Sequence, residues 1–426
     1  MNLTKQFFKY VSQNIFGLIG TSCYILADTY FIAQAAGTDG VTLLNLCLPM
    51  YNLIFAFGSM IGLGAATRYA ILQAQGEARA QRFFSNAILC ACLIAIPFML
   101  AGAFCPGTLL QLMGGDADIV ALGLNYTRIF LLFTPFFMCN YIFSAFVRND
   151  GDPSLAMVAT LSGSLFNVVF DYIFMFPMGL GLAGAALATV IGQTVTLVLY
   201  LVVYCTTASP VRLRRKALRP DASLEGRLYA IGVPAILNLA LPSLLVTFLN
   251  DLLAAFSESY VVVLGIYYKL QTFLYLPANG FVQGMRPLIG YNYGAGEYDR
   301  VKKLYRTSMG MCAAIMAAGT VLCLALSGQL IGLFSSNAET IAIGTSALRI
   351  ICVGFIVSTI SVVASGSLEG LGMGVQSLVI SLCRYIVVIM PLAWLFCRLL
   401  GADGIWNAFW VTEVITAGIS MVVYHK

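Results

Sequence analysis

Long apolar runs, separated by short polar or Gly/Pro-containing connections, recur twelve times along the sequence. Each run exceeds the ~20 residues that an α-helix needs to cross the hydrocarbon core of a bilayer. The runs lie at 8–35, 42–72, 83–107, 119–147, 155–177, 182–206, 228–256, 261–290, 304–334, 340–367, 375–400 and 404–424. Helices suit runs of this length better than barrel strands, which need only ~9–11 residues. The sequence therefore predicts an all-α polytopic membrane protein with twelve transmembrane helices.

The composition excludes a soluble globular protein. Hydrophobic residues make up 60% of the 426 residues and charged residues only 10%, whereas soluble domains carry about 25% charged residues. The net charge of +5 is modest and unevenly spread, so it does not indicate a nucleic-acid partner. The twelve cysteines lie mostly singly within apolar runs, where Cys acts as a small apolar side chain. The single histidine, His425, excludes a His-based metal site.

Basic residues concentrate in alternate connections, which predicts the orientation of the chain in the membrane. Six of them lie in the longest polar stretch, Thr206 to Arg227, and the opposite connections carry acids and only one basic residue, Arg398. Because cytoplasmic loops are enriched in Lys and Arg, we expect both termini and this stretch on the cytoplasmic side of the cell membrane. The stretch is interpreted as an anchor near anionic lipid rather than a ligand site. No cleavable signal peptide pattern precedes the first run, so the first helix is expected to remain.

The second half of the sequence repeats the first. Three motifs align at offsets of 222, 221 and 220 residues: Gly58 with Gly280, Arg128 with Arg349, and Gly181 with Gly401. We therefore expect two bundles of six helices, related by a pseudo-two-fold axis along the membrane normal, which is a transporter architecture. The predicted domains are an N-lobe at 1–207, a cytoplasmic linker at 208–227 and a C-lobe at 228–426.

Two acids lie deep in the apolar runs of the N-terminal half. Counting ~1.5 Å per residue from the outer end of each run places Asp28 and Asp171 at a depth of about 9–10 Å, and Thr189 at the same level. Asn167 precedes Asp171 by one helical turn, and these runs hold no basic residue at that level. Such oxygen clusters hold a hard cation or an exchangeable proton. The alternative, that each acid is simply protonated or hydrogen-bonded within the bundle, stays open.

The C-terminal half offers a possible basic partner for each acid in its apolar runs. Asp251 and Lys269 are both expected ~8–12 Å from the outer surface, and Arg384 and Glu413 near the middle of the membrane. Buried charges usually pair with one another. These pairs are therefore predicted to be fixed, structural ion pairs.

Four motifs, "YILADTYFI", "SLFNVVFDYIF", "GLAGAALAT" and "QGMRPLIGYNYGAGEYDRVKK", resemble those of the multidrug and toxic compound extrusion (MATE) family, in its DinF-like (MepA-like) branch. The resemblance covers essentially the whole chain. It implies the twelve-helix MATE fold and an antiporter that exports cationic or amphipathic compounds against inward flow of Na⁺ or H⁺. The cation-coupling residues that it implies are Asp28, Asn167, Asp171, Thr189 and the carbonyl of Ala185. Relatives carry a proline early in the first helix, where Ser12–Gln13 stand here, and Gly17 and Gly20 are then the expected points of flexing.

The leading functional hypothesis is an antiporter coupled to H⁺ or Na⁺, with Na⁺ held by Asp28, Asn167, Asp171 and Thr189. It implies no enzymatic activity, no cofactor beyond the coupling ion, and a monomer in lipid that binds small organic substrates. Aromatic and Met side chains suit varied apolar cations. The residues expected in the substrate cavity are Tyr30, Met50, Tyr51, Tyr275, Asp251 and Lys269.

Two alternatives belong to different functional classes. A flippase for lipid-linked precursors is expected to carry more basic residues in its cavity. A membrane-embedded transferase needs acids at the membrane surface that bind Mg²⁺ and phosphate. The only candidate for that role is the turn with Asp150 and Asp152, which helix capping explains more simply.

Overall fold

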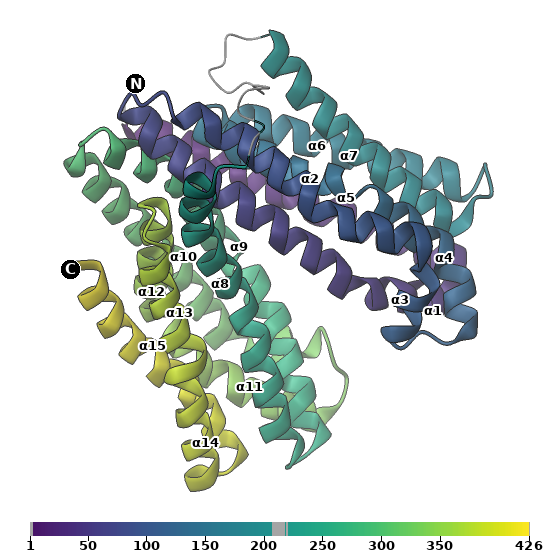
Figure 1. Ribbon diagram of the computed structural model, residues 1–426. Helices are drawn as coiled ribbons and strands as arrows, with labels where there is room; N and C mark the ends of the chain where they lie inside the picture. The colour runs from purple at the N-terminus through teal and green to yellow at the C-terminus, as the bar shows by residue number, and fades with distance from the viewer. Residues whose placement is uncertain (1–2, 207–217, 219, 426) are drawn as a thin grey trace. The chain divides into compact units, whose positions relative to one another are not determined.

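The computed structural model describes residues 3–206, 218 and 220–425, and all regular structure within them is helical (Figure 1). The chain forms two compact units, one of Ser12–Gly232 and one of Met1–Val11 with Val233–Lys426. Most of the predicted linker lies outside the described residues, as do five of its basic residues, Arg212, Arg214, Arg215, Lys216 and Arg219. The domain boundary at 207 therefore stays a prediction.

The helices of the first half include one that is far too long for a single crossing. They are α1 (Leu3–Ala74), α2 (Ala80–Phe104), α3 (Pro106–Leu112), α4 (Ala117–Leu132), α5 (Thr134–Asn149), α6 (Pro153–Met175) and α7 (Gly181–Thr206). A straight helix of the 72 residues of α1 would measure about 108 Å, more than three times the ~30 Å hydrocarbon core. Its backbone leaves the helical conformation at Gly37, with φ 61° and ψ −144°, a left-handed conformation that favours glycine. We assign one span to each side of Gly37.

The fourth span is also broken. Helices α4 and α5 meet at Phe133 with a bend of 47°. Pro135 stands in the first turn of α5, where its ring prevents the preceding helix from continuing. The Thr134 hydroxyl donates to the carbonyl oxygen of Leu131 at 2.7 Å and so satisfies a group that the break exposes.

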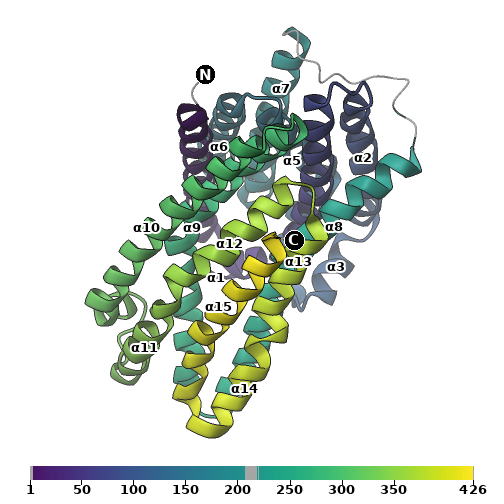
Figure 2. The same cartoon turned by 90° about the vertical axis from the view of Figure 1, so that its left-hand side faces the viewer.

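The second half contains two spans built of several helical pieces. Its elements are α8 (Ala222–Ala254), α9 (Glu258–Gly294), α10 (Tyr298–Gly332), α11 (Ala338–Ile351), η2 (Cys352–Gly354), α12 (Phe355–Gly370), α13 (Gly374–Leu382), η3 (Cys383–Val387), α14 (Ile389–Leu400) and α15 (Ala402–His425). Helices α11 and α12 form one span, as do α13 and α14. Figure 2 shows α14 and α15 side by side.

The predicted fold is confirmed. Ten helical stretches of the described chain are long and apolar enough to span a membrane, the bent α4–α5 pair makes eleven, and the break at Gly37 divides α1 into two, which makes twelve. Protein covers only 22–61% of the residues in the apolar windows of these helices. Lipid must cover the rest, so the chain is a multi-pass membrane protein. Three predicted starts were wrong: α8 begins at Ala222 and α10 at Tyr298, each six residues before the predicted start, and α1 begins at Leu3, five residues before it.

Helices α6 and α7 approach each other closely through two glycines. A Cβ atom on Gly163 would meet the Thr196 hydroxyl and the carbonyl oxygen of Gly192, and a Cβ on Gly192 would meet the carbonyl oxygen of Gly163. Small residues allow such backbone contact between helices in membranes. Asn167 follows Gly163 by one turn and lies against Gly192, so the close packing of α6 on α7 brings the polar groups of the two helices within hydrogen-bonding distance.

Candidate functional site

The buried face of α6 carries the amide and the acid that the sequence predicts as cation ligands. Gly163, Asn167, Asp171 and Met175 follow one another at intervals of four residues and are all buried, Asp171 completely. Residues at this spacing share one face of a helix. Large apolar side chains occupy the other faces and are exposed: Leu165, Phe166, Val169 and Tyr172. The acid therefore points into the protein and away from lipid.

Helix α7 supplies a hydroxyl and a carbonyl oxygen beside that face. The Thr189 Oγ1 lies 3.2 Å from the amide group of Asn167 and donates to the Ala185 carbonyl oxygen at 3.0 Å. When the Asn167 nitrogen faces Asp171, it donates to Asp171 Oδ2 at 3.2 Å, and the amide oxygen accepts from the backbone N–H of Thr189 at 3.1 Å. In that orientation Asn167 links the acid of α6 to the backbone of α7.

Helix α1 completes the cluster with Asp28. Its carboxyl group is in side-chain hydrogen-bond contact with that of Asp171. The Oδ1 atom of each acid is buried and has no hydrogen-bond partner in the described chain. The ion pairs among the described residues are Arg286–Glu369, Arg300–Glu297 and Arg384–Glu413, and none includes either acid. Two carboxyl groups in contact without a base require a shared proton or a shared cation.

Tyrosines surround the two acids. Tyr24 and Tyr126 interact electrostatically with both carboxyl groups, and Tyr51 with that of Asp28. Tyr24 and Tyr126 were not predicted as members of this site. Tyr24 precedes Asp28 by four residues and so lies on the same face of α1, a spacing that could have identified it. Nothing in the sequence marks Tyr126 in the same way.

The residues expected in the substrate cavity lie in different surroundings. Tyr30 is 60% exposed and Met50 is buried, while the Tyr51 ring stacks on Phe130 with centroids 4.2 Å apart. Tyr275 belongs to the other unit, where it is buried and its hydroxyl lies 2.7 Å from that of Ser358. The structure does not gather the four residues into one pocket within either unit.

The predicted pairing of Asp251 with Lys269 is wrong. Both residues are exposed, no ion pair of the described chain joins them, and the Lys269 ammonium lies 6.0 Å from the centroid of the Phe334 ring. The physical reason is the different distance of the two residues from the connection between α8 and α9. At ~1.5 Å per residue, Asp251 lies about 5 Å from the end of α8 and Lys269 about 16 Å from the start of α9. The two connected helices therefore place the charges at different levels.

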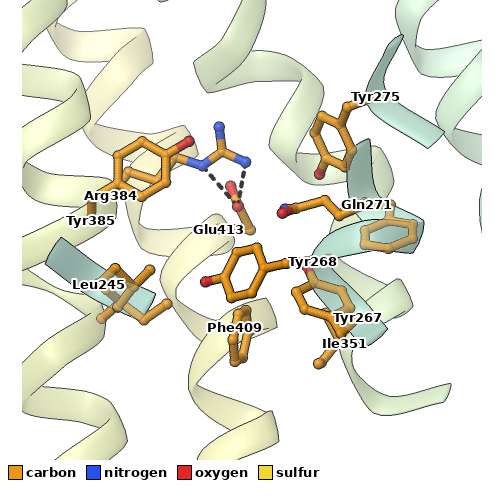
Figure 3. Close-up of a pocket in the computed structure, with 13 residues that line it drawn as sticks. Leu245, Tyr267, Tyr268, Gln271, Tyr275, Ile351, Arg384, Tyr385, Phe409 and Glu413 are labelled. Carbon is orange, nitrogen blue, oxygen red and sulfur yellow. Dashed lines mark hydrogen bonds and ion pairs between the residues drawn. The ribbon is translucent and has the colours of Figure 1, made fainter. Parts of the chain in front are cut away.

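The structure does bring Arg384 and Glu413 together. Glu413 Oε1 accepts from Arg384 Nε at 2.9 Å and from Nη2 at 2.7 Å. The two side chains are only 11% and 15% exposed. Figure 3 shows the pair in a pocket whose walls include Tyr267, Tyr268 and Tyr275.

A second buried acid of the C-terminal half escaped the sequence analysis. Glu369 in α12 is 4% exposed, forms an ion pair with Arg286 of α9, and accepts hydrogen bonds from Asn238 of α8 at 2.8 Å and Ser377 of α13 at 3.1 Å. The network joins four helices. Arg286 stands inside the motif "QGMRPLIGYNYGAGEYDRVKK", and a basic residue there was the available signal for a buried acidic partner.

The acidic turn before α6 is a helix cap, as expected. Asp152 accepts a hydrogen bond from the backbone N–H of Leu155 at 3.2 Å, and Asp150 accepts one from the Tyr69 hydroxyl at 2.7 Å. The described residues contain no group of three or more His, Cys, Asp or Glu side chains that could hold a metal ion. All twelve cysteines are free.

Comparisons with known proteins agree over most of the chain. A protein-family model described as MatE matches residues 14–173 and 234–395. The Multidrug export protein MepA of Staphylococcus saprophyticus is 24% identical over 403 residues, which cover 94% of this chain and 89% of that protein. The outward-facing structure of a multidrug resistance MATE family transporter of the MOP superfamily superposes with a TM-score of 0.88 at 21% identity, covering 100% of this chain and 96% of that chain. A structure of MATE in the bent conformation superposes with a TM-score of 0.90 at 22% identity, covering 100% of this chain and 95% of that chain.

Proposed function

This chain belongs to the MatE family, and on that premise we propose that it is a cation-coupled antiporter that exports cationic or amphipathic organic compounds. Relatives named as multidrug export proteins support export as its activity. The observation that carries the coupling is the contact between Asp28 and Asp171, two acids on different helices with no basic partner among the described residues. The proposal assigns no catalytic step to the chain.

Five oxygen-bearing groups would hold the coupling ion. The carboxyl groups of Asp28 and Asp171 supply its counter-charge, and Asn167, Thr189 and the Ala185 carbonyl supply neutral ligands. A proton would instead be shared by the two carboxyl groups alone. When either ion departs, two carboxylates face each other without a counter-charge.

That repulsion links the ion to the conformation of the protein. Two like charges ~4 Å apart repel by about 4 kcal/mol at an effective dielectric constant of about 20. A difference of about 4 kcal/mol changes a two-state equilibrium constant about a thousandfold, for example from about 1:30 to about 30:1. Release of the ion is thus strong enough to separate α1 from α6 and α7, and rebinding brings them together. In α1 the only proline is Pro49, well beyond Asp28, so we assign the flexing before Asp28 to Gly17 and Gly20.

Replacement of Thr189 by Ala is expected to weaken the ion dependence of export without abolishing it. The variant loses one neutral ligand and the contact of Thr189 Oγ1 with Asn167. A net hydrogen bond contributes about 1 kcal/mol, so the ion concentration for half-maximal export should rise about fivefold. The matched control is Thr194→Ala, whose hydroxyl bonds to the Val190 carbonyl on the same helix. An equal effect of the two substitutions would contradict the role given to Thr189.

Both termini and the connection between the halves are proposed to face the cytoplasm, from the distribution of basic residues. A membrane-impermeant maleimide added to intact cells should fail to label Arg215→Cys, a position outside the described residues, and should label Asp116→Cys at the start of α4. The native cysteines that are exposed in the structure, Cys23, Cys92, Cys105 and Cys205, are removed first. Labelling of position 215 but not of position 116 would reverse the orientation.

The flippase alternative is not favoured by the charges of the described spans. A polyanionic lipid precursor needs basic groups available to it, whereas Arg384 and Arg286 each form an ion pair with a neighbouring glutamate. The transferase alternative loses its only candidate residues, because Asp150 and Asp152 bond to Tyr69 and to the start of α6.

A further inference from the structure

The pocket around Arg384 and Glu413 lies entirely within one unit of the chain. Its empty space is ≈ 410 Å³, part of it open to the surroundings. Its walls come from α8, α9, α11, α12, α14, α15 and the two short segments η2 and η3 (Figure 3). The lining is strongly aromatic: Tyr267, Tyr268, Tyr275, Phe355, Tyr385 and Phe409. A charged pair set among aromatic rings in a cavity is typical of a ligand site.

The helices around this pocket depart from regular geometry at two places. Segment η3, Cys383–Val387, is a π-helical turn in which the Val388 N–H donates to the Cys383 carbonyl at 3.0 Å. Arg384 lies in this turn. The 3₁₀ segment η2 ends at Gly354, which packs on the backbone of Trp410 and on the Glu413 side chain. Irregular turns inside membrane helices cost hydrogen-bond quality and recur at functional sites, which a purely structural ion pair does not require.

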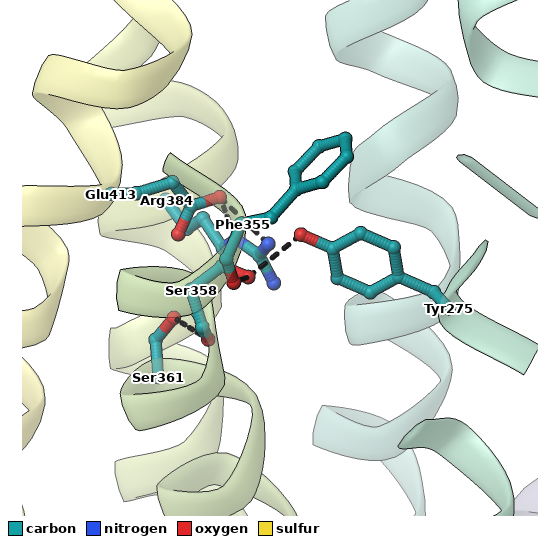
Figure 4. Close-up of polar contacts among 6 residues, drawn as sticks. All are labelled: Tyr275, Phe355, Ser358, Ser361, Arg384 and Glu413. Atoms are coloured by element: carbon teal, nitrogen blue, oxygen red, sulfur yellow. Dashed lines mark hydrogen bonds and ion pairs between the residues drawn. The ribbon is translucent and has the colours of Figure 1, made fainter. Parts of the chain in front are cut away.

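Polar groups in the pocket retain unused hydrogen-bonding capacity. Both bonds from Arg384 end on Glu413 Oε1, and the Glu413 carboxyl group is also in side-chain hydrogen-bond contact with Ser361. The Tyr268 hydroxyl is buried without a partner in the described chain. Arg384 uses two of its five N–H groups in these bonds. Tyr275, by contrast, is held by Ser358, whose hydroxyl bonds to the Phe355 carbonyl (Figure 4). A ligand can thus be bound by Glu413 as acceptor and by Arg384 as donor at once.

The charge of the pocket restricts the ligand. Arg384 and Glu413 neutralise each other, and the described residues of the pocket lining include no other charged side chain. A monocation at Glu413 Oε2 would face the Arg384 guanidinium, and a monoanion at Arg384 would face the carboxylate. Because an uncompensated charge is costly at this depth, we propose that the pocket is a substrate subsite that selects aromatic zwitterions, with the ligand ammonium at Glu413 and its carboxylate at Arg384. As a subsite for exported compounds it rests on the proposed function, and it narrows the class of compound from amphipathic to zwitterionic.

Three probes that share one ring system and differ in charge test this selection. In mildly acidic buffer β-naphthylalanine is a zwitterion, its amide is a monocation and its N-acetyl derivative is a monoanion. Binding to the full-length protein in lipid nanodiscs is measured by equilibrium dialysis, with empty nanodiscs as the blank. The zwitterion is expected to bind at least tenfold more tightly than either derivative. Equal binding of the three probes would overturn the proposal.

Substitutions at the pair should reverse the preference in opposite directions. With Arg384→Gln the remaining carboxylate should make the amide the tightest probe, and with Glu413→Gln the remaining guanidinium should make the N-acetyl derivative the tightest. A loss of structure alone would weaken all three probes without changing their order. Gln271→Glu adds a charge to the pocket lining while leaving the pair intact, and it should raise the affinity for the amide even where the other variants fail to fold.

The control is Lys269→Gln, which removes a charge from the same helix as Gln271 but lies outside the pocket, over Phe334. Its order of probe affinities should match that of the unmodified protein. The same order in every variant, Gln271→Glu included, would overturn the proposal. Because binding needs no ion gradient, Asp28→Asn with Asp171→Asn should keep the preference. If the Arg384 and Glu413 substitutions reverse the probe preference but the unmodified protein shows no ion-driven export, the zwitterion subsite is supported and the proposed antiport function is contradicted.

Discussion

Asp171→Asn and Asp28→Asn are each expected to abolish ion-driven export. Asparagine keeps nearly the same size and removes the negative charge on which a bound cation depends. Loss of an interaction of about 4 kcal/mol corresponds to roughly a thousandfold weaker cation binding. Export of a fluorescent amphipathic dye from proteoliposomes under an imposed Na⁺ or H⁺ gradient should fall to the level of protein-free vesicles. The two variants should fold normally, because each removes the repulsion between the acids.

The matched control for this experiment is Asp118→Asn, which removes an acid from the first turn of α4. It should export dye as the unmodified protein does. Export at the unmodified rate by the double variant Asp28→Asn, Asp171→Asn would contradict the assignment and move the coupling ion to another acid, of which Glu413 and Glu369 are the buried candidates.

Glu413→Gln is expected to cause a large loss of stability. It leaves the Arg384 guanidinium, only 11% exposed, without its counter-charge. Breaking a buried ion pair from one side costs about 3–5 kcal/mol, which corresponds to a fall in Tm of about 3–6 °C for a chain of 426 residues. Thermal unfolding of the detergent-solubilised protein, followed by the fluorescence of a thiol-reactive dye on its buried cysteines, measures the change.

A second substitution shows whether the loss comes from the pair. Arg384→Gln together with Glu413→Gln should recover part of the stability, since neither charge is then left alone. Lys269→Gln, which removes an exposed charge from the same unit, should leave Tm nearly unchanged. Losses that simply add in the double variant would mean that the two residues do not interact.

The sequence allowed the twelve spans and the four side chains of the N-terminal cluster to be found, because both depend on long-range regularities of helices. Depth and the family motifs pointed to the same residues, Asp28, Asp171 and Thr189, whereas the pairing of Asp251 with Lys269 depended on depth alone. The family resemblance carried by the motifs is confirmed by the MatE match. The predicted end of the α8 run was two residues too late and the predicted start of the α9 run three residues too late, and these errors together were enough to pair Asp251 wrongly with Lys269.

Other features of the structure could not be predicted from helical periodicity. The π-turn at Cys383–Val387 lies in an apolar run that reads as ordinary helix, since one extra residue per turn leaves no mark in composition. The Glu369–Arg286 pair depends on how α9 packs against α12, two helices that are far apart in sequence. Start positions were predicted from hydropathy, which could not reveal that α8 begins among the polar residues at Ala222.

The central claim, that the Asp28–Asp171 site exchanges a cation for an exported compound, is tested most directly by measuring both fluxes in the same vesicles. Proteoliposomes are prepared without an ion gradient, a gradient of fluorescent dye is imposed, and the movement of H⁺ and of Na⁺ is recorded together with that of the dye. The account predicts that one of the two ions moves opposite to the dye, in a fixed ratio, and that this counterflow disappears in the Asp28→Asn, Asp171→Asn variant. Dye movement without any ion counterflow, or the same counterflow in the variant, would contradict it.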